Sequence, residues 1–301
     1  MDRRAVIDIG SNSVKLLVAD LRGGRLHERE DRVIVTRLSE GLRETGRIGG
    51  AAARRTMDAL RELREAGVRA GAGSFIAAGT QALRRAANAP DIALRIRREC
   101  GLDVEILSGD EEARLSWVAA LSGLADPSIP AGVFDTGGAS TEFVMGKDGR
   151  IEKRFSFPVG VRGPTEEFGT DGPATKERVA ALVRSLSESL APLPPLEGTL
   201  IGVGGTVLTL ASVMTGAGRY DPTALAGALL SRAEVDRQVE LYRSLPAEGR
   251  GKIPGMVPGR ADVMLAGAAI VRVILDLSGK DRLLVSARGL RHGLLLDRYS
   301  G

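Results

Sequence analysis

The chain has 301 residues, 43% of them hydrophobic, which is enough for about two compact domains. Its 42 Lys and Arg side chains outweigh its 38 Asp and Glu side chains only slightly, to a net charge of +4, so its charge does not indicate a nucleic-acid-binding protein. A single cysteine, Cys100, excludes an internal disulfide framework and a metal site built from several cysteines, and it favours a reducing, cytoplasmic location.

The first residues with a regular pattern belong to strands. Residues 5–19 form two predicted strands about a turn at residues 10–13, where glycine and asparagine tolerate the positive φ angle of a hairpin. Asp8 closes the first of these strands, and residues 26–38 continue the sheet. Residues 51–66 then follow the helical period, which predicts a surface helix. This order is typical of the start of a mixed α/β layer.

Two helix starts in the first half carry charged side chains that could face a ligand. The strand at residues 74–79 leads into a turn and a helix with Arg84, which could face a ligand at the carboxyl end of the strand. A helix face exposed to solvent would explain this arginine equally well. After the next short strand, Ser108 and Glu111 have the spacing of a capping box, which places Glu112 in the first helical turn. Because acidic first turns also occur for helix-dipole reasons alone, this segment does not by itself decide between function and structure.

The second half repeats the succession of strands and helices. Residues 125–131, with two prolines, are interpreted as the linker between the halves, and residues 150–159 predict a strand. The strand at residues 199–203 opens a Gly-Gly-Thr turn at residues 204–206, and the apolar helix that follows could hold an anion with its first amides. Alternatively, the glycines of this turn are explained by close packing of the helix on the strand, which also requires small residues. Residues 261–277 predict a buried helix, too short and too charged for a membrane span.

A short internal repeat links the two halves. Shifting residues 133–145 back by 127 positions, without a gap, lays them on residues 6–18. The shift matches three residues of the first copy to three of the second, namely Asp8 to Asp135, Gly10 to Gly137 and Ser13 to Ser140. Each copy places a carboxylate, a glycine turn and hydroxyl groups between two apolar runs, which suggests a loop for phosphate and metal. Two ordinary hairpins are the alternative.

Several chemistries are excluded by what the sequence lacks. Its only histidines are His27 and His292, which rules out zinc sites of the His-Glu-x-x-His type, and neither lies beside an apparent nucleophile elbow. The sequence contains neither the G-x-x-x-x-G-K-[S/T] loop nor a Rossmann fingerprint. Carboxylates and loops of glycine and hydroxyl residues remain, and they fit phosphoryl chemistry with Mg²⁺.

Seven segments of the chain resemble the motifs of the Ppx/GppA family of exopolyphosphatases and guanosine pentaphosphate phosphohydrolases, within the actin, sugar kinase and Hsp70 ATPase superfamily. They are residues 5–13, 79–88, 108–115, 135–142, 202–206, 257–262 and 285–293. Each segment alone is a weak signal, but seven in the right order over nearly the whole chain are a strong one. The chain resembles a short form without an additional C-terminal helical domain.

The resemblance implies the fold. Family members have two ribonuclease-H-like, actin-like domains, each a mixed sheet flanked by helices, with a cleft between them. We therefore expect an α/β protein with domain I at residues 1–117 plus 290–301 and domain II at residues 118–289. A homodimer is expected by resemblance only.

The resemblance also implies the roles of individual residues. Glu112 matches the carboxylate that activates the attacking water, and Asp8, Asp135 and Glu142 match the metal-side carboxylates. The implied cofactor is Mg²⁺, with Mn²⁺ as a substitute. The residues expected to bind phosphate are Gly10, Ser11, Asn12, Ser13, Lys15, Arg84, Gly137, Gly138, Ala139, Ser140, Thr141, Gly204, Gly205, Thr206 and Arg260.

Together these residues predict an exopolyphosphatase, a Mg²⁺-dependent hydrolase that removes the terminal phosphate of inorganic polyphosphate. Hydrolysis of guanosine pentaphosphate is the close alternative, and a nucleotide sensor or a sugar-kinase-like phosphotransferase is the alternative from another class. Ala139, Ala226 and Ala287 stand where the family usually has glycine, histidine and aspartate, which leaves the nucleotide side of the site open. Neither a nucleic acid nor a membrane is expected as a partner.

Overall fold

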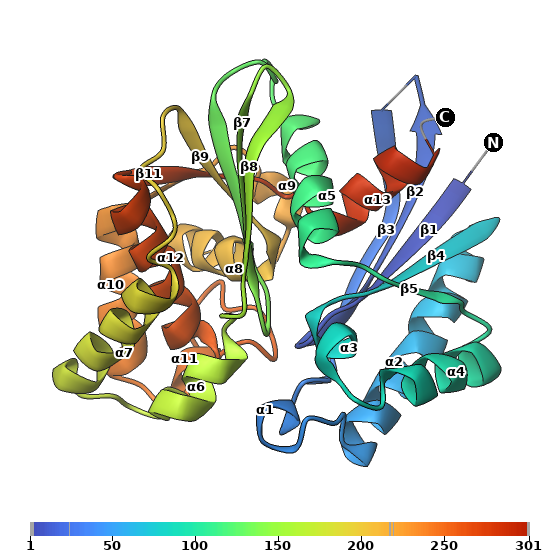
Figure 1. The fold of residues 1–301 in the computed structure, drawn as a ribbon, viewed down its shortest axis with the longest axis horizontal. Coiled ribbons are helices and arrows are strands. Elements are labelled where there is room, and N and C mark those ends of the chain that lie inside the picture. Colours follow the sequence, from blue (N-terminus) through green and yellow to red (C-terminus); the bar gives the residue numbers. More distant parts are fainter. Residues whose placement is uncertain (1–2, 24, 217, 219, 300–301) are drawn as a thin grey trace. The chain divides into compact units, whose positions relative to one another are not determined.

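The computed structural model describes residues 3–23, 25–216, 218 and 220–299, and it divides into two compact units (Figure 1). Unit 1 comprises Met1–Ala119 with Leu290–Gly301, and unit 2 comprises Ala120–Gly289. The sequence-based division, after residue 117, lies two residues from this one, and the return to the first unit begins at residue 290 in both.

Unit 1 is built on a mixed five-stranded sheet. In hydrogen-bonded order its strands are β3 (Arg25–Val35), β2 (Ser13–Arg22), β1 (Arg3–Ile9), β4 (Ser74–Gly79) and β5 (Val104–Ile106). β1 pairs antiparallel with β2 and parallel with β4, and β4 is parallel to β5. The carboxyl ends of β1, β4 and β5 therefore meet at one edge of the sheet, where ligands commonly bind in α/β folds.

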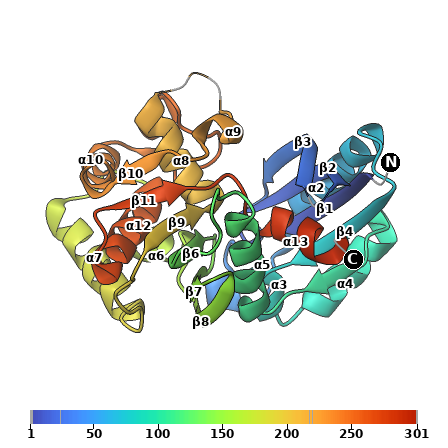
Figure 2. The ribbon, with the colours of Figure 1, turned by 90° about the horizontal axis from the view of Figure 1, so that it is seen from above.

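Helices cover both faces of this sheet. They are α1 (Leu42–Thr45), α2 (Gly50–Arg69), α3 (Gln81–Arg85), α4 (Ala89–Cys100), α5 (Gly109–Leu121, which continues into unit 2) and α13 (Leu290–Tyr299). Successive residues of a strand point to opposite faces of the sheet. The apolar stripes of α2 and α4 pack on the face that carries Ile7. On the opposite face, Leu115 of α5 and Leu294 of α13 pack against Val6 and Leu17. Figure 2 shows α13 alongside this sheet.

Unit 2 has a mixed six-stranded sheet with its own helices. In hydrogen-bonded order the strands are β10 (Leu229–Ser231), β11 (Arg282–Val285), β9 (Thr199–Val203), β6 (Ala131–Thr136), β7 (Thr141–Lys147) and β8 (Arg150–Phe157). The helices are α6 (Arg162–Phe168), α7 (Lys176–Ser189), α8 (Gly204–Thr215), α9 (Pro222–Leu225), α10 (Arg232–Arg243), α11 (Ala247–Gly251) and α12 (Met264–Ser278). Two mixed sheets flanked by helices confirm the predicted fold class.

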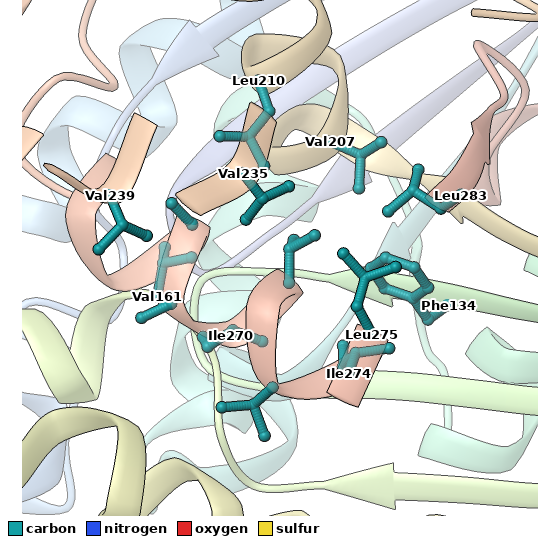
Figure 3. Packing of buried hydrophobic residues seen from close by; sticks show 14 of the residues in the cluster. Phe134, Val161, Val207, Leu210, Val235, Val239, Ile270, Ile274, Leu275 and Leu283 are labelled. Atoms are coloured by element: carbon teal, nitrogen blue, oxygen red, sulfur yellow. The ribbon is translucent and has the colours of Figure 1, made fainter. Parts of the chain in front are cut away.

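The core of unit 2 is organised around α12. This helix is apolar over most of its circumference, as the sequence predicts for residues 261–277, and Ile270 and Leu275 are fully buried. Figure 3 shows these side chains packed among residues from β6, α8 and α10, including Phe134, Val207 and Val235. Among the described helices, none has the length and apolar character needed to cross a bilayer.

The internal repeat of the sequence is a repeat of structure. β1, β2 and β3 have the same order and antiparallel pairing as β6, β7 and β8, and the parallel neighbour is β4 in one unit and β9 in the other. The turns match as well, because Gly10 N–H donates to Ser13 O over 3.0 Å and Gly137 N–H donates to Ser140 O over 2.9 Å. The repeat found in the sequence is therefore also a repeat of backbone geometry, whatever the two turns bind.

Two details differ from the sequence-based expectations. Residues 125–131 are not a linker between halves but lie inside unit 2, as a loop that ends where β6 begins at Ala131. The loop is held there because Asp148 N–H donates to Ser128 O and Thr199 N–H donates to Pro130 O. The helix after β9 begins at Gly204, directly at the end of the strand, so the glycine turn is itself the first turn of α8.

Candidate functional site

The turn between β1 and β2, residues 10–13, is named phosphate loop one. Its three polar side chains, Ser11, Asn12 and Ser13, are buried at the edge of the unit 1 sheet. A Cβ atom on Gly10 would lie 2.9 Å from Ser13 O, the acceptor of the turn hydrogen bond, so this position requires glycine.

Asp8 and Asn12 have buried polar atoms without a protein partner. Lys15 lies opposite Asp8 in the β1 and β2 pair, and its Nζ atom is 3.1 Å from Asp8 Oδ2. Asp8 Oδ1 and both polar atoms of the Asn12 side chain are buried and make no hydrogen bond. Because a buried polar atom left unpaired costs about 1–3 kcal/mol, these atoms are suited to a polar ligand at this loop.

A segment after β3 supports phosphate loop one from behind. Thr36 N–H and Arg37 N–H both donate to Asn12 O, and Ser39 N–H donates to Ser11 O. The Asn12 N–H belongs to the same peptide group as the Ser11 C=O. Because the N–H and C=O of a trans peptide point in opposite directions, the Asn12 N–H is directed away from this segment. Arg37 has a φ angle of 51°, unusual for a residue with a Cβ, and the sequence analysis did not single it out.

Glu112 lies in the first turn of α5, where the capping motif predicted it. Ser108 Oγ accepts a hydrogen bond of 3.1 Å from Glu111 N–H, and Glu112 N–H donates to Ser108 O. Glu112 is only 7% exposed. Arg84 Nη1 donates to Glu112 Oε1 and to Leu107 O, so the structure brings these two predicted site residues together.

The turn between β6 and β7, residues 137–140, is named phosphate loop two. Ala139 replaces the usual third glycine, and the turn accommodates its Cβ, because Arg37 and Asp148 are the only described residues with a side chain and a positive φ angle. The loop is held by the segment after β8, where Val161 N–H donates to Gly137 O over 3.0 Å and Arg162 N–H donates to Gly138 O over 2.8 Å.

Two predicted metal-side carboxylates face each other across a strand pair. Asp135 of β6 is the direct partner of Glu142 of β7, so their side chains lie on the same face of the sheet. Ser156 Oγ, on β8, donates to Glu142 Oε1 over 3.2 Å. Gly204 lies against this pair, since a Cβ atom there would be 2.1 Å from Asp135 Oδ1. Its φ angle of 82° and its lack of a side chain let the start of α8 approach Asp135 closely.

The residues that could hold a metal are these carboxylates, and they do not form a complete site on their own. Within the described residues, no three His, Cys, Asp or Glu side chains gather as they would around a preformed ion. Asp135 and Glu142 belong to unit 2, and Asp8 belongs to unit 1. A pair of carboxylate side chains fits Mg²⁺, which usually takes one or two protein carboxylates and completes its shell with water and phosphate oxygens.

Arg260 is buried against the start of α8. Its guanidinium would be 2.3 Å from a Cβ atom on Gly205, and its Nη2 lies 3.3 Å from Thr206 Oγ1. Burial lowers the pKa of Arg260 below its ordinary value, while Tyr220, Asp135 and Asp262 act in the opposite direction. Arg260 Nε makes no hydrogen bond, so this buried cation is suited to an anionic ligand.

Both threonines expected to bind phosphate use their hydroxyl groups within the protein. Thr141 Oγ1 donates to Val159 O over 2.6 Å, and Thr206 Oγ1 donates to Thr136 O over 2.9 Å. Both contacts fix the ends of phosphate loop two and of β6. The hydroxyl protons of these residues therefore stabilise the loop.

Sequence analysis missed two arginines that support this half of the site. Arg162 forms an ion pair with Asp262 over 2.9 Å, in the segment that carries Arg260. Arg250 is fully buried and donates to Tyr242 O, Thr170 O and Gly172 O, and burial lowers its pKa to about 10. No local signal marks either residue, because their partners are distant in the sequence and several are backbone carbonyls.

Comparison with known proteins covers nearly the whole chain. The model of the Ppx/GppA phosphatase family matches residues 6–300. The chain is 30% identical over 316 aligned positions to Exopolyphosphatase 2 of Mycobacterium tuberculosis, covering 99% of this chain and 98% of the relative. It is 28% identical to Exopolyphosphatase 1 of Mycobacterium leprae, covering 98% of this chain and 89% of that protein.

Solved structures give the same result. The crystal structure of the Aquifex aeolicus member of the Ppx/GppA family is 34% identical, with a TM-score of 0.83 and coverage of 98% of this chain and 97% of that one. An exopolyphosphatase from Cytophaga hutchinsonii is 27% identical, with a TM-score of 0.88 and coverage of 98% of both chains. Sequence and fold thus agree, and the chain belongs to the Ppx/GppA phosphatase family.

Proposed function

We propose that this protein is an exopolyphosphatase that hydrolyses the terminal phosphate of inorganic polyphosphate. The observation that carries the proposal is Glu112, a buried carboxylate at the same edge of the unit 1 sheet as Asp8 and phosphate loop one. The similarity to proteins named exopolyphosphatase over almost their full length supports the choice of substrate.

In this proposal unit 1 supplies the base and part of the phosphate site. A water oxygen bonds to the terminal phosphorus, the bridging P–O bond breaks, and the shortened polyphosphate leaves. Glu112 accepts the proton of the attacking water, since a carboxylate base is well suited to this transfer. Gly10, Ser11, Asn12 and Ser13 bind phosphate oxygens, and Lys15 adds a positive charge beside them.

Unit 2 supplies the remaining phosphate ligands and the metal-side carboxylates. Phosphate loop two and the start of α8, with Arg260, are proposed to bind phosphate oxygens. Asp135 and Glu142 would hold Mg²⁺ or Mn²⁺, and Asp8 is the metal-side carboxylate that we propose for unit 1. When bound, such an ion would neutralise negative charge on the phosphate oxygens. Catalysis in this proposal needs residues of both units.

The proposal is tested by measuring phosphate release from purified protein. Short polyphosphate, long polyphosphate, guanosine pentaphosphate and ATP are compared, each with Mg²⁺, with Mn²⁺ and with a chelator. We expect release from polyphosphate that depends on the divalent ion. Faster release from guanosine pentaphosphate would favour the alternative substrate, and transfer to a sugar or absence of release would exclude the proposed activity. Light scattering on the same sample tests the proposed homodimer.

Replacing the proposed base tests the mechanism directly. Glu112→Gln keeps the shape of the side chain but removes its ability to accept a proton, so we expect kcat to fall by about 10²-fold or more with little change in KM. Asp110→Asn is the matched control, because Asp110 is exposed in the same helical turn and its replacement changes the charge equally. Unchanged turnover in Glu112→Gln would remove Glu112 from this role.

A further inference from the structure

Arg84 is engaged almost completely by groups of unit 1. Its Nη1 donates to Glu112 Oε1 and Leu107 O, and its Nε and Nη2 both donate to Gln81 Oε1. A guanidinium has five N–H groups in a fixed plane. These four hydrogen bonds therefore leave at most one N–H for a ligand.

The fold places Arg84 between two neighbouring strand ends. Arg84 lies on α3, which follows β4, while Leu107 and the start of α5 follow β5, the parallel neighbour of β4. Leu107 N–H donates to Gly79 O, which ties the two strand ends together. Arg84 thus bridges the ends of β4 and β5 through its side chain, in addition to this backbone contact.

The other charges at the start of α5 are directed elsewhere. Arg114 pairs with Glu111 and with Asp297 of α13, and these contacts lower the pKa of both carboxylates. Lys15 is paired with Asp8. Arg85, next to Arg84 on α3, is exposed. Arg84, in contrast, forms an ion pair with Glu112 through Nη1 and Oε1.

We infer that Arg84 is a positioning residue that acts on hydrolysis through Glu112, by fixing the carboxylate that receives the proton of the attacking water. This inference rests on the proposed role of Glu112. It differs from the expectation that Arg84 binds phosphate directly. The planar guanidinium is suited to this task, because Gln81 and Leu107 hold its plane while Nη1 holds one carboxylate oxygen.

A double-mutant cycle distinguishes action through Glu112 from direct contact with phosphate. The four proteins are wild type, Arg84→Gln, Glu112→Gln and the double variant, and kcat and KM are measured for short polyphosphate. We expect Arg84→Gln to lower kcat about tenfold or more when Glu112 is present, and less than about twofold in the Glu112→Gln background. Equal losses in both backgrounds would overturn the inference, as would a rise in KM that persists without Glu112.

Controls separate this result from charge, folding and the proposed function. Arg85→Gln removes the same charge from the same helix, and we expect wild-type kcat. Thermal unfolding shows whether Arg84→Gln is folded; if it is not, Arg84→Lys takes its place in the cycle, since lysine keeps the charge but cannot form the fork. Wild-type protein without polyphosphatase activity would refute the proposed function, and the inference with it. Active wild type with additive losses refutes the inference alone.

Discussion

Gly160 and the backbone of phosphate loop two lie so close together that no side chain fits between them. A Cβ atom on Gly160 would be 2.4 Å from Ala139 N and 2.6 Å from Ser140 N. The hydrogen bonds from Val161 and Arg162 to the loop carbonyls depend on this approach. Phosphate loop two therefore requires glycine at position 160, a residue that is not part of the loop itself.

We expect Gly160→Ala to displace phosphate loop two. The added methyl group meets backbone atoms that cannot rotate away, so the variant should lose about 1–3 kcal/mol of stability and most of its activity on polyphosphate. Gly163→Ala is the control, because a Cβ atom there meets nothing within 4 Å and Gly163 lies in α6. Calorimetry and phosphate release measure the two effects, and a Gly160→Ala protein with wild-type kcat and melting temperature would contradict the expectation.

At the residue scale, the sequence pointed to the groups that we propose to carry the chemistry, but not to the groups that support them. Asp8 and Asp135 are recognisable near the end of a strand and Glu112 near the start of a helix, each in a local pattern. Gly160, Arg162 and Arg250 could not be predicted, since their partners are backbone atoms or side chains far away in the sequence.

At the scale of elements, α5 shows how a local signal sets the position of a functional side chain. The Ser108 side chain accepts from Glu111 N–H, which fixes the first turn and with it the backbone of Glu112. Strands and hairpins were predictable for the same reason, because alternating apolar residues and turn glycines are local. α6 was not predicted, since its seven residues include one glycine and one proline and it is short.

Removing this cap should affect catalysis as well as stability. We expect Ser108→Ala to cost about 0.5–2 kcal/mol and to lower kcat, because the first turn of α5 frays where Glu112 lies. Ser231→Ala is the matched control: Ser231 caps α10 by accepting from Glu234 N–H over the same 3.1 Å, so it should lose similar stability with kcat unchanged. Denaturant unfolding and steady-state kinetics give both values, and equal kinetic effects in the two variants would count against the role of the α5 cap.

At the scale of the whole molecule, the two units differ in how the chain builds them. Unit 2 is formed by the continuous stretch Ala120–Gly289, whereas unit 1 needs the return of Leu290–Gly301. α13 supplies Leu290, Leu294 and Leu295 to one face of the unit 1 sheet. It also approaches α5 closely, because a Cβ atom on Gly293 would be 2.1 Å from Leu115 O.

Ending the chain at Gly289 should therefore prevent unit 1 from folding. Loss of three buried leucines, each worth about 2–5 kcal/mol, is comparable to the whole stability of a typical domain. Unit 2 should keep its own cooperative transition, since its core comes entirely from residues within it. Circular dichroism and calorimetry of the truncated chain check this, and a melting profile like that of the full chain would show that α13 is dispensable.

The repeat that relates the hairpins also relates Lys15 to Glu142, each facing the aspartate of its own copy. One copy therefore holds a neutral pair, with a cation beside a turn of hydroxyl groups, and the other holds two negative charges. An anion favours the first setting and a divalent cation the second. A single exchange of sign at one register position thus gives two otherwise equivalent supersecondary units a different local charge.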